Sequence, residues 1–415
     1  MSTVANARPM RILWIAHVFP PVGGTQGLRM ARYLQELTHG SSLQVDVLTI
    51  RQSRNNPQWD AALAAGLPGS VSIHRVNPGW LYQHRFAWKL DHRAEARGRS
   101  WLLNAIRLGN LPWLPRAARW ILGRGRRRYD GIYVFADPLV SIALGLLAAR
   151  LNPDARLVLE YGRGLPAPHR GAAFLERHAL ARCRAAIVRT QATVRAYRDR
   201  YPAVPGDRFI VLYGGVDRGL YDATGGPFIQ DRFSIVYTGV VYSDTVSPEP
   251  FFRAVQQIVS GGVALDVVMA GARSPAVEQI VARLDLAGVV SMPGHLALAE
   301  VAAVQQRASL LLAFGFRDPF KISSKLAQYF AARVPVLYIA GSGADPGAVL
   351  VSQSRRGLVV ANDTAEIRAA IESVRLLRVD GGLAGRFDLS STDEYSWESV
   401  ARSVGSLLTG SGLEP

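Results

Sequence analysis

The chain has 415 residues, enough for two or three domains, and its 49% hydrophobic and 19% charged residues are typical of a folded globular protein and not of a disordered or collagen-like one. Its 48 basic and 32 acidic residues give a formal net charge of +16, which favours anionic partners such as nucleotides, polyphosphates, nucleic acid or an acidic membrane surface. The single cysteine, Cys183, excludes a disulfide framework and a cysteine-based zinc cluster.

Short apolar runs that are rich in β-branched residues alternate with helical stretches along most of the chain. Most of these runs are apolar on both faces, which is typical of parallel strands covered by helices on both sides. In the first half we expect strands at residues 12–17, 43–50, 71–76, 132–135, 157–160, 186–190 and 210–212. In the second half we expect them at 235–238, 265–270, 289–292, 310–313, 336–339 and 358–360.

This alternation predicts an α/β protein with two Rossmann-like domains, each a doubly wound parallel sheet. The boundary falls within residues 222–231, where Ala-Thr-Gly-Gly-Pro interrupts the periodicity. We therefore expect an N-terminal domain over residues 1–225 and a C-terminal domain over 226–392. Residues 393–415 follow the last strand, and their amphipathic helix at 397–408 can pack back on the first domain.

A basic, tryptophan-rich segment covers residues 80–128, with five of the eight tryptophans and twelve basic residues against two acidic ones. Within it, a helix at 114–128 would place Trp113 and Trp120 beside an apolar stripe and arginines, including Arg126 and Arg127, on another side. Such a helix is typical of a membrane-surface contact. Equally, the aromatic residues can belong to the core and the arginines to a solvated face. Nucleic-acid binding lacks any recognisable recognition module.

Two features bear on the location of the chain. The longest largely apolar run, residues 139–149, is too short to span a bilayer. The polar first ten residues lack the apolar core of a signal peptide. We therefore expect a cytoplasmic protein, peripheral on the inner face of the cell membrane.

The first predicted strand leads into a glycine pair, Gly23 and Gly24, before a helix that begins near Thr25. Glycines at a strand-to-helix turn let backbone N–H groups approach an anion, and the helix dipole favours it there. The alternative is an ordinary tight turn, and for the glycine pair alone the two interpretations are even. The chain contains neither a GxGxxG fingerprint nor a GxxxxGK[ST] loop.

The second candidate segment covers residues 319–337, where Ser323 or Ser324 can cap a helix that has Lys325 in its first turn. A cation at that position opposes the helix dipole, so helix stability alone does not explain it. Only three of the 48 basic residues are lysines, and two of the three, Lys321 and Lys325, lie in this segment. A compact ammonium suits a bound phosphate.

Together these motifs resemble the GT-B glycosyltransferases, and within them the family 4-like, retaining, sugar-nucleotide-dependent group. The resemblance rests on Phe19-Pro-Pro-x-Gly-Gly24 and Ser324-Lys325-Leu326-x-Gln-Tyr-x-Ala-x-x-x-Pro335-Val, supported by Ile210-Val-Leu-Tyr-Gly-Gly-Val-Asp217, Tyr237-Thr-Gly239, Pro293-Gly294-His295 and Tyr395-Ser-Trp397. It covers nearly the whole chain. It implies two Rossmann-like domains that face each other across a cleft, with a nucleotide-diphosphate sugar bound mainly by the C-terminal domain and the acceptor by the N-terminal one.

The resemblance also implies roles for individual residues. Lys325 and Ser324 would neutralise the diphosphate, and Gly23 and Gly24 would close on it from the other domain. Gly294, His295 and Leu296 would border the nucleobase. Gln328 stands where the family usually has the second glutamate of its EX7E pattern, a ribose ligand, and Phe320 stands at the first. The basic pair usual after the first C-domain strand is missing, and Lys321 or Arg317 can substitute for it; Arg333 replaces the glycine that normally ends the helix.

Catalysis on this interpretation means stabilising a departing diphosphate, a task for positioned cations and amides such as Lys325. The chain has no Asp-x-Asp metal motif, so we expect no metal and no cofactor beyond a UDP- or GDP-sugar donor substrate. His17 and Asp137, each after a strand of the N-terminal domain, are candidate acceptor-side residues, and Arg163 can meet an acceptor phosphate. The alternatives are a satisfied strand-end histidine, a turn aspartate and a surface arginine.

The leading hypothesis is therefore a metal-independent glycosyltransferase of the hexosyltransferase type, acting on a saccharide or polyprenyl-diphosphate-linked acceptor in cell-envelope or polysaccharide biosynthesis. The alternative is a non-catalytic GT-B protein that serves as a membrane-associated partner of another glycosyltransferase. The missing glutamates and the missing basic pair motivate that alternative.

Overall fold

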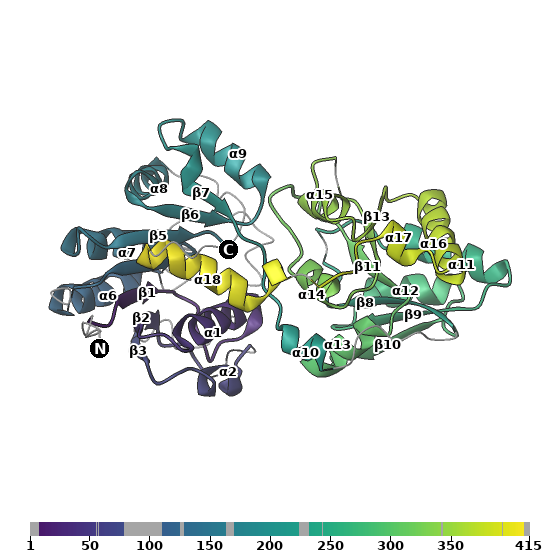
Figure 1. Cartoon of the computed structure of the whole chain (residues 1–415), viewed down its shortest axis with the longest axis horizontal. Helices are drawn as coiled ribbons and strands as arrows, with labels where there is room; N and C mark the ends of the chain where they lie inside the picture. Colours follow the sequence, from purple (N-terminus) through teal and green to yellow (C-terminus); the bar gives the residue numbers. More distant parts are fainter. Residues whose placement is uncertain are drawn as a thin grey trace, which may run out of the picture. The chain divides into compact units, whose positions relative to one another are not determined.

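The computed structural model describes residues 8–410 apart from 55, 57, 79–109, 125–127, 163–169, 224–231, 243, 342 and 392. The chain divides into two compact units, which are described separately (Figure 1). The first unit contains the chain up to Arg189, the stretch Thr193–Leu212 and the C-terminal part from Trp397. The second contains Thr190–Ala192 and Tyr213–Ser396. The expected boundary at 225/226 lies outside the described residues.

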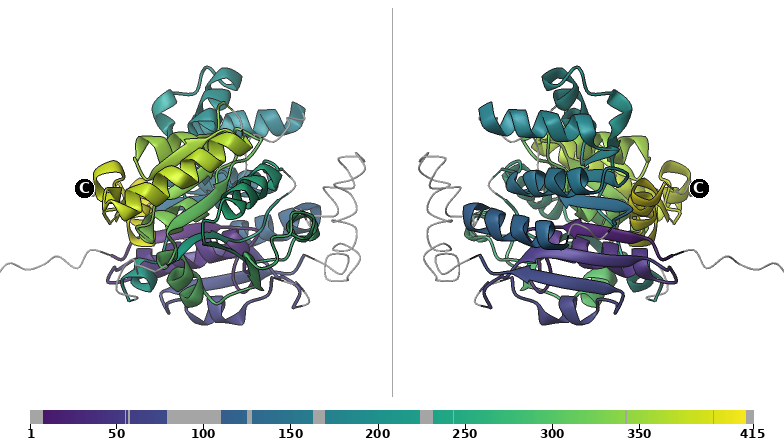
Figure 2. Two further views of the ribbon diagram at one scale, coloured as in Figure 1. Left: turned by 90° about the vertical axis from the view of Figure 1, so that its right-hand side faces the viewer. Right: turned by 90° about the vertical axis from the view of Figure 1, so that its left-hand side faces the viewer.

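The sheet of the first unit has seven described strands, all paired in parallel, in the order β3-β2-β1-β4-β5-β6-β7. In the right-hand view of Figure 2 the purple strands from the first part of the chain lie side by side in this sheet. The chain order reverses between β1 and β4, the topological switch point of this sheet. The strands are β1 (Arg11–Ile15), β2 (Gln44–Ile50), β3 (Val71–Val76), β4 (Gly131–Phe135), β5 (Arg156–Glu160), β6 (Ala185–Val188) and β7 (Phe209–Val211).

The sheet of the second unit has six described strands, also all parallel, in the order β10-β9-β8-β11-β12-β13. Its chain order reverses between β8 and β11. The strands are β8 (Phe233–Thr238), β9 (Leu265–Ala270), β10 (Val290–Gly294), β11 (Leu310–Phe314), β12 (Val336–Ile339) and β13 (Gly357–Val360).

Helices cover both faces of each sheet. In the first unit they are α1 (Gly24–Thr38), α2 (Ala61–Ala65), α6 (Asn110–Arg124), α7 (Val140–Leu151), α8 (Arg170–Arg182), α9 (Gln191–Arg200, beginning in the second unit), the 3₁₀ turn Gly206–Arg208 and α18 (Trp397–Thr409). In the second unit they are α10 (Arg218–Asp222), α11 (Glu249–Ser260), α12 (Pro275–Arg283), α13 (Leu298–Gln306), α14 (Lys325–Ala331), α15 (Pro346–Gln353), α16 (Thr364–Val379), α17 (Leu383–Arg386) and the 3₁₀ turn Asp393–Tyr395.

Each sheet separates two apolar cores. In the first unit α6, α7, α8 and α9 bury one face, and α1 with α18 buries the other; in the second unit α11, α12 and α16 oppose α10, α13, α14 and α15. A Val, Leu or Ile side chain fully buried in such a core contributes about 1.5–3 kcal/mol to stability. Helix α18, yellow in Figure 1, lies beside α1 and places Trp397 among the buried aromatic rings of the first unit.

The predicted fold class is confirmed. All thirteen expected strands are present, each within two residues of its expected ends, because continuous branched apolar runs suit strands buried on both faces. Among the described residues, no helix combines the length and the apolar character needed to cross a bilayer.

The helix expected at 114–128 is α6, and its apolar stripe faces the protein interior. Trp113, Ala117 and Ile121 are buried in the core, while Trp120 is half-buried with its ring centroid 4.7 Å from that of His74. Because these residues pack inside the protein, they are not available for contact with a membrane. They belong to the core, which was the second of the two interpretations of this helix. Arg126, Arg127 and residues 80–109 lie outside the described residues.

Candidate functional site

The switch point of the second unit brings two candidate segments together. Strands β8 and β11 are neighbours, so the residues that follow them meet at the carboxyl edge of the sheet, the usual ligand site of doubly wound folds. Gly239 directly follows β8, and Lys325 begins α14 at the end of the loop from β11. The buried face of α14, formed by Leu326, Tyr329 and Phe330, fixes the helix against the sheet.

Lys325 turns its ammonium toward β8. Its Nζ lies 3.0 Å from the hydroxyl oxygen of Tyr237 and 4.5 Å from the centre of that ring, while the Tyr237 hydroxyl donates to the carbonyl oxygen of Val240 at 2.6 Å. No described carboxylate forms an ion pair with Lys325. Burial lowers the pKa of Lys325 to about 8. The ammonium is therefore held in place by a neutral partner, and its positive charge remains available to an anion.

Three glycines line the same edge at positive φ: Gly239 (118°), Gly271 (135°) and Gly294 (82°), each at or just after the end of a strand. A Cβ atom on Gly239 would overlap Cε and Nζ of Lys325, and one on Gly271 would overlap the backbone of Gly239. The N–H of Gly271 donates to the carbonyl oxygen of Gly294 at 2.8 Å. These residues form a continuous glycine cradle from the switch point to the end of β10, and we use that name for them below.

The other candidates near α14 have different surroundings. Ser324 is exposed at the N-cap position without a side-chain capping bond, and the backbone N–H of Lys325 donates to Ser323 Oγ at 3.3 Å. Gln328 is half-buried one turn further on. Lys321 pairs with Asp244 at 2.5 Å, and both side chains are exposed. The charge of Lys321 is therefore already compensated, whereas that of Lys325 is not.

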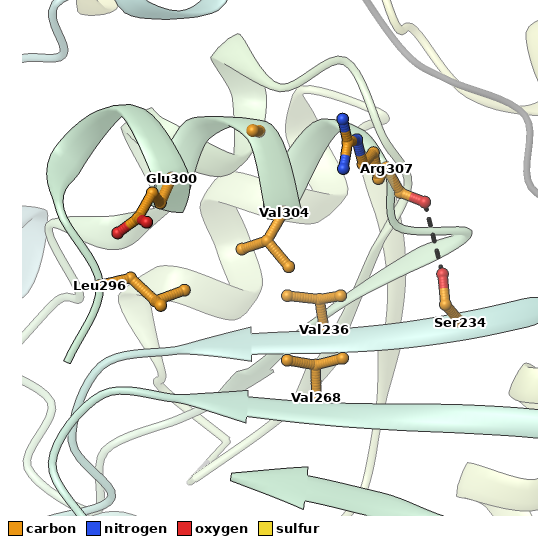
Figure 3. A pocket seen from close by; sticks show the side chains of 8 residues that line it. Ser234, Val236, Val268, Leu296, Glu300, Val304 and Arg307 are labelled. Carbon is orange, nitrogen blue, oxygen red and sulfur yellow. Dashed lines mark hydrogen bonds between the residues drawn. The ribbon is translucent and has the colours of Figure 1, made fainter. Parts of the chain in front are cut away.

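The residues expected beside the nucleobase lie two strands away on the same edge. Gly294 ends β10, His295 is exposed, and Leu296 lines a pocket of about 360 Å³ between α13 and strands β8 and β9. Figure 3 shows Val236 and Val268 pointing up from the strands and Val304 pointing down from the helix, so the pocket has an apolar interior. Its volume is within the range of small-molecule sites. The nucleobase role of these residues stays a prediction.

The first unit brings its own candidates to the switch point between β1 and β4. His17 follows β1 and is only 7% exposed, with its ring 5.3 Å from that of Trp113. The N–H of Gly23 donates to the carbonyl oxygen of Gln58 at 2.6 Å, and exposed Gly24 begins α1 at a φ of 71°. Asp137 is half-buried in the turn from β4 to α7.

These surroundings favour the structural alternatives for two of the candidates. The burial of His17 against Trp113 favours a histidine with a structural role at the end of its strand. The backbone N–H of Gly23 was a candidate phosphate donor, but it already donates a hydrogen bond to the carbonyl oxygen of Gln58. The joint contact of Gly23, Gly24 and Lys325 with one diphosphate remains a prediction. Arg163 lies outside the described residues, in which no group of three potential metal-ligating side chains gathers.

Sequence reasoning missed the contact of Tyr237 with Lys325 and the close approach of Gly271 to Gly239. One signal for the glycine was present, because β8, β9 and β10 each lead into a glycine. Tyr237 carried no such signal, since an aromatic residue in a strand is ordinary.

Comparison with known proteins identifies the fold. No protein-family model matches the sequence, and no curated protein matches it. Among solved structures, sucrose-phosphate synthase from Thermosynechococcus elongatus superposes with a TM-score of 0.66 at 16% identity over 96% of this chain and 98% of that one. Anabaena HepE, solved with UDP and glucose, gives 0.58 at 14% identity, covering 96% and 95% of the two chains.

A third structure, UDP-GlcNAc 2-epimerase from Neisseria meningitidis bound to UDP-GlcNAc, gives a TM-score of 0.61 at 12% identity over 97% of this chain and 100% of that chain. Together with the two parallel sheets, these likenesses show that the chain has the GT-B fold, as expected. At such identities they show the fold alone.

Proposed function

We propose that this protein is a glycosyltransferase that moves a sugar from a nucleotide-diphosphate sugar to a saccharide acceptor. The observation that carries the proposal is the half-buried ammonium of Lys325, which lies at the switch point of the second sheet beside the glycine cradle and forms no ion pair with a described carboxylate. Two neighbours in fold, HepE and the 2-epimerase, were solved with UDP or a UDP-sugar, which supports a UDP-sugar as donor.

The chemistry follows from the charge of the leaving group. Breaking a glycosyl–phosphate bond adds negative charge to the departing diphosphate, and an ammonium about 4 Å away stabilises one unit of that charge by about 4 kcal/mol at an effective dielectric constant of about 20. That free energy corresponds to a rate factor of about 10³. The glycines of the cradle make room for the Lys325 side chain beside Gly239 and for the close contact of Gly239 with Gly271, and Lys325 supplies the cation.

The finer parts of the proposal are a retaining outcome, a lipid-linked acceptor in cell-envelope or polysaccharide assembly, and a cytoplasmic location at the inner face of the membrane. The net charge of +16 supports an anionic surface as partner. The packing of α6 removes one argument for it, so any membrane contact must use other residues. The half-buried position of Asp137 beside the β1–β4 switch point leaves it as the acceptor-side candidate.

The alternative of a non-catalytic partner protein rests on Phe320 and Gln328, which stand where the family resemblance places two glutamates. Gln328 keeps an acceptor oxygen for a ribose hydroxyl but carries no charge. The two functions differ in turnover, so a turnover assay separates them.

The test incubates the purified protein with membranes and a panel of UDP-, GDP- and ADP-sugars and measures released nucleoside diphosphate together with the labelled sugar. We expect release with at least one donor and transfer of its label to the acceptor fraction. Lys325→Met should abolish both, and Arg368→Met, which removes an exposed cation on α16 of the same unit, should leave both unchanged. Binding without release would favour the non-catalytic alternative. A chemically altered sugar nucleotide with no acceptor product would favour an epimerase.

A further inference from the structure

The contact between Lys325 and β8 suggests how the site holds its cation. Tyr237 is 4% exposed at the end of β8, and its hydroxyl is 3.0 Å from Lys325 Nζ. That hydroxyl donates its own proton to the carbonyl oxygen of Val240 at 2.6 Å. Toward the ammonium it therefore acts as a hydrogen-bond acceptor. The ring face adds a second attraction, with Nζ 4.5 Å from its centre.

The described phenols around this contact are neutral. Burial raises the pKa of Tyr237, and burial raises that of Tyr329, which accepts from the Thr238 N–H at 3.1 Å, to about 12. Both phenols are therefore uncharged near neutral pH. Tyr242, in the loop after β8, is exposed. In the neighbouring loops Lys321 forms an ion pair with Asp244, so the charges of these two side chains compensate each other.

Gly239 completes the arrangement. A Cβ atom on this residue would occupy the space that Cε and Nζ of Lys325 now fill. The ammonium of Lys325 therefore occupies the position that the first side-chain atom of residue 239 would take. The resemblance expects basic side chains soon after this strand, and here a cation reaches that place from the neighbouring helix instead.

We propose that Tyr237 is a positioning residue, which fixes the ammonium of Lys325 over the space left open by Gly239 so that it meets the diphosphate of the donor. This inference rests on the proposed function for the identity of the anion. The hold of Tyr237 on Lys325 is a separate claim that can be measured without any ligand. Tyr237 acts through Lys325 and touches no reacting atom.

The small number of lysines makes a direct measurement practical. Protein labelled with lysine carrying ¹³C at Cε gives signals from only three side chains, Lys89, Lys321 and Lys325, and Lys325→Met identifies the relevant one by its loss. In the unliganded wild type we expect the Lys325 signal to titrate near pH 8. UDP should move its midpoint upward by about one pH unit or more, because a bound anion favours the ammonium.

Tyr237→Phe keeps the ring and removes the acceptor oxygen. We expect it to lower the midpoint of the Lys325 titration in the free protein and to weaken UDP binding about tenfold at pH 7, the usual size of a lost bond to a charged group. Tyr237→Leu removes the ring as well and should weaken binding further. The matched control is Tyr242→Phe, which removes an exposed hydroxyl of the following loop and should change neither quantity.

An unchanged Lys325 midpoint in a folded Tyr237→Phe protein would overturn the inference, as would an equal loss of affinity in Tyr242→Phe. If no nucleotide moves the Lys325 signal of the wild type while Tyr237→Phe still lowers its midpoint, the proposed function fails and the hold of Tyr237 on the ammonium stands.

Discussion

Replacing Lys325 by methionine should make the protein more stable while it removes the proposed function. Folding transfers this ammonium to a half-buried place where no described carboxylate pairs with it, and burial lowers its pKa from 10.5 to about 8. Each unit of pKa corresponds to about 1.4 kcal/mol, so the charged side chain lowers the free energy of unfolding by at most about 3 kcal/mol, less any screening by the solvent that still reaches it. Methionine has a similar length and carries no charge to bury.

The sign of the pH dependence follows from proton binding. Because the pKa is lower in the folded state, the unfolded state binds more protons between about pH 8 and pH 10.5, and the free energy of unfolding rises with pH in this window. Below pH 8 the destabilisation is complete, and above 10.5 it is absent. The methionine variant should therefore exceed the wild type by up to about 3 kcal/mol at pH 7, with a difference that vanishes by about pH 10.5. Groups shared by the two proteins cancel in this difference.

The assay is urea unfolding at several pH values, followed by two probes. All eight tryptophans lie in the sequence range of the first unit, so tryptophan fluorescence reports that unit, while far-ultraviolet circular dichroism reports both. We expect the stabilisation in the dichroism transition of the second unit. Arg368→Met, the exposed control, should not show it. A methionine variant that is no more stable than the wild type at pH 7, or a difference that is constant up to pH 10.5, would refute the reasoning.

Four further predictions concern single residues. Gly239→Ala should displace the Lys325 ammonium and destabilise the second unit by about 1–3 kcal/mol, measured by urea unfolding and UDP calorimetry, because its φ of 118° strains any L-residue. Arg333→Gly should stabilise by up to about 1 kcal/mol in urea, since the arginine holds a φ of 58° and its pair with Asp222 at 3.6 Å is partly exposed. Glu160→Gln should cost about 3–5 kcal/mol at pH 7, because the buried carboxylate is paired with two arginines. Cys183 should resist thiol reagents in native protein and react only at the rate of unfolding, since burial raises its pKa to about 12.

The expected pH dependence of the Glu160 contribution is opposite to that of Lys325. Burial by itself raises the pKa of this carboxyl, but the guanidinium groups of Arg189 and Arg29 and the hydroxyl of Tyr133 outweigh it, so the net shift is downward. Its stabilisation is therefore present above pH 4.5 and is lost as the pH falls through the lower folded pKa. Acid titration of wild type against Glu160→Gln measures this directly.

The fold was predictable because local pattern and tertiary environment agree in it. The run at 310–313 is apolar throughout and the run at 235–238 is apolar up to Thr238, and such short continuous runs are typical of strands covered on both faces. Lys325 could be singled out because lysine is scarce in this chain. The α6 helix was ambiguous, since a basic amphipathic pattern serves a core and a membrane equally, and only packing shows that Trp113 is buried.

The partners of Lys325 could not be predicted, because they depend on which strands become neighbours. Tyr237 and Gly239 lie more than eighty residues before Lys325, and they meet it only because β11 pairs with β8 at the reversal of the strand order. The contact between Gly239 and Gly271 likewise follows from the pairing of β8 with β9. The sequence shows three strands that lead into glycine, but not that they form one edge.

The cation at this edge opposes local stability. An ammonium without an ion pair to any described carboxylate lowers the stability of the unliganded protein, and it fills the space that the missing Cβ atom of Gly239 leaves. The buried Glu160 of the first unit differs, because two guanidinium groups and a phenol surround its charge. No described carboxylate pairs with Lys325, so the burial of its charge keeps an electrostatic cost. A bound anion removes the electrostatic part of that cost, which is why ligand binding and proton uptake by Lys325 should be coupled.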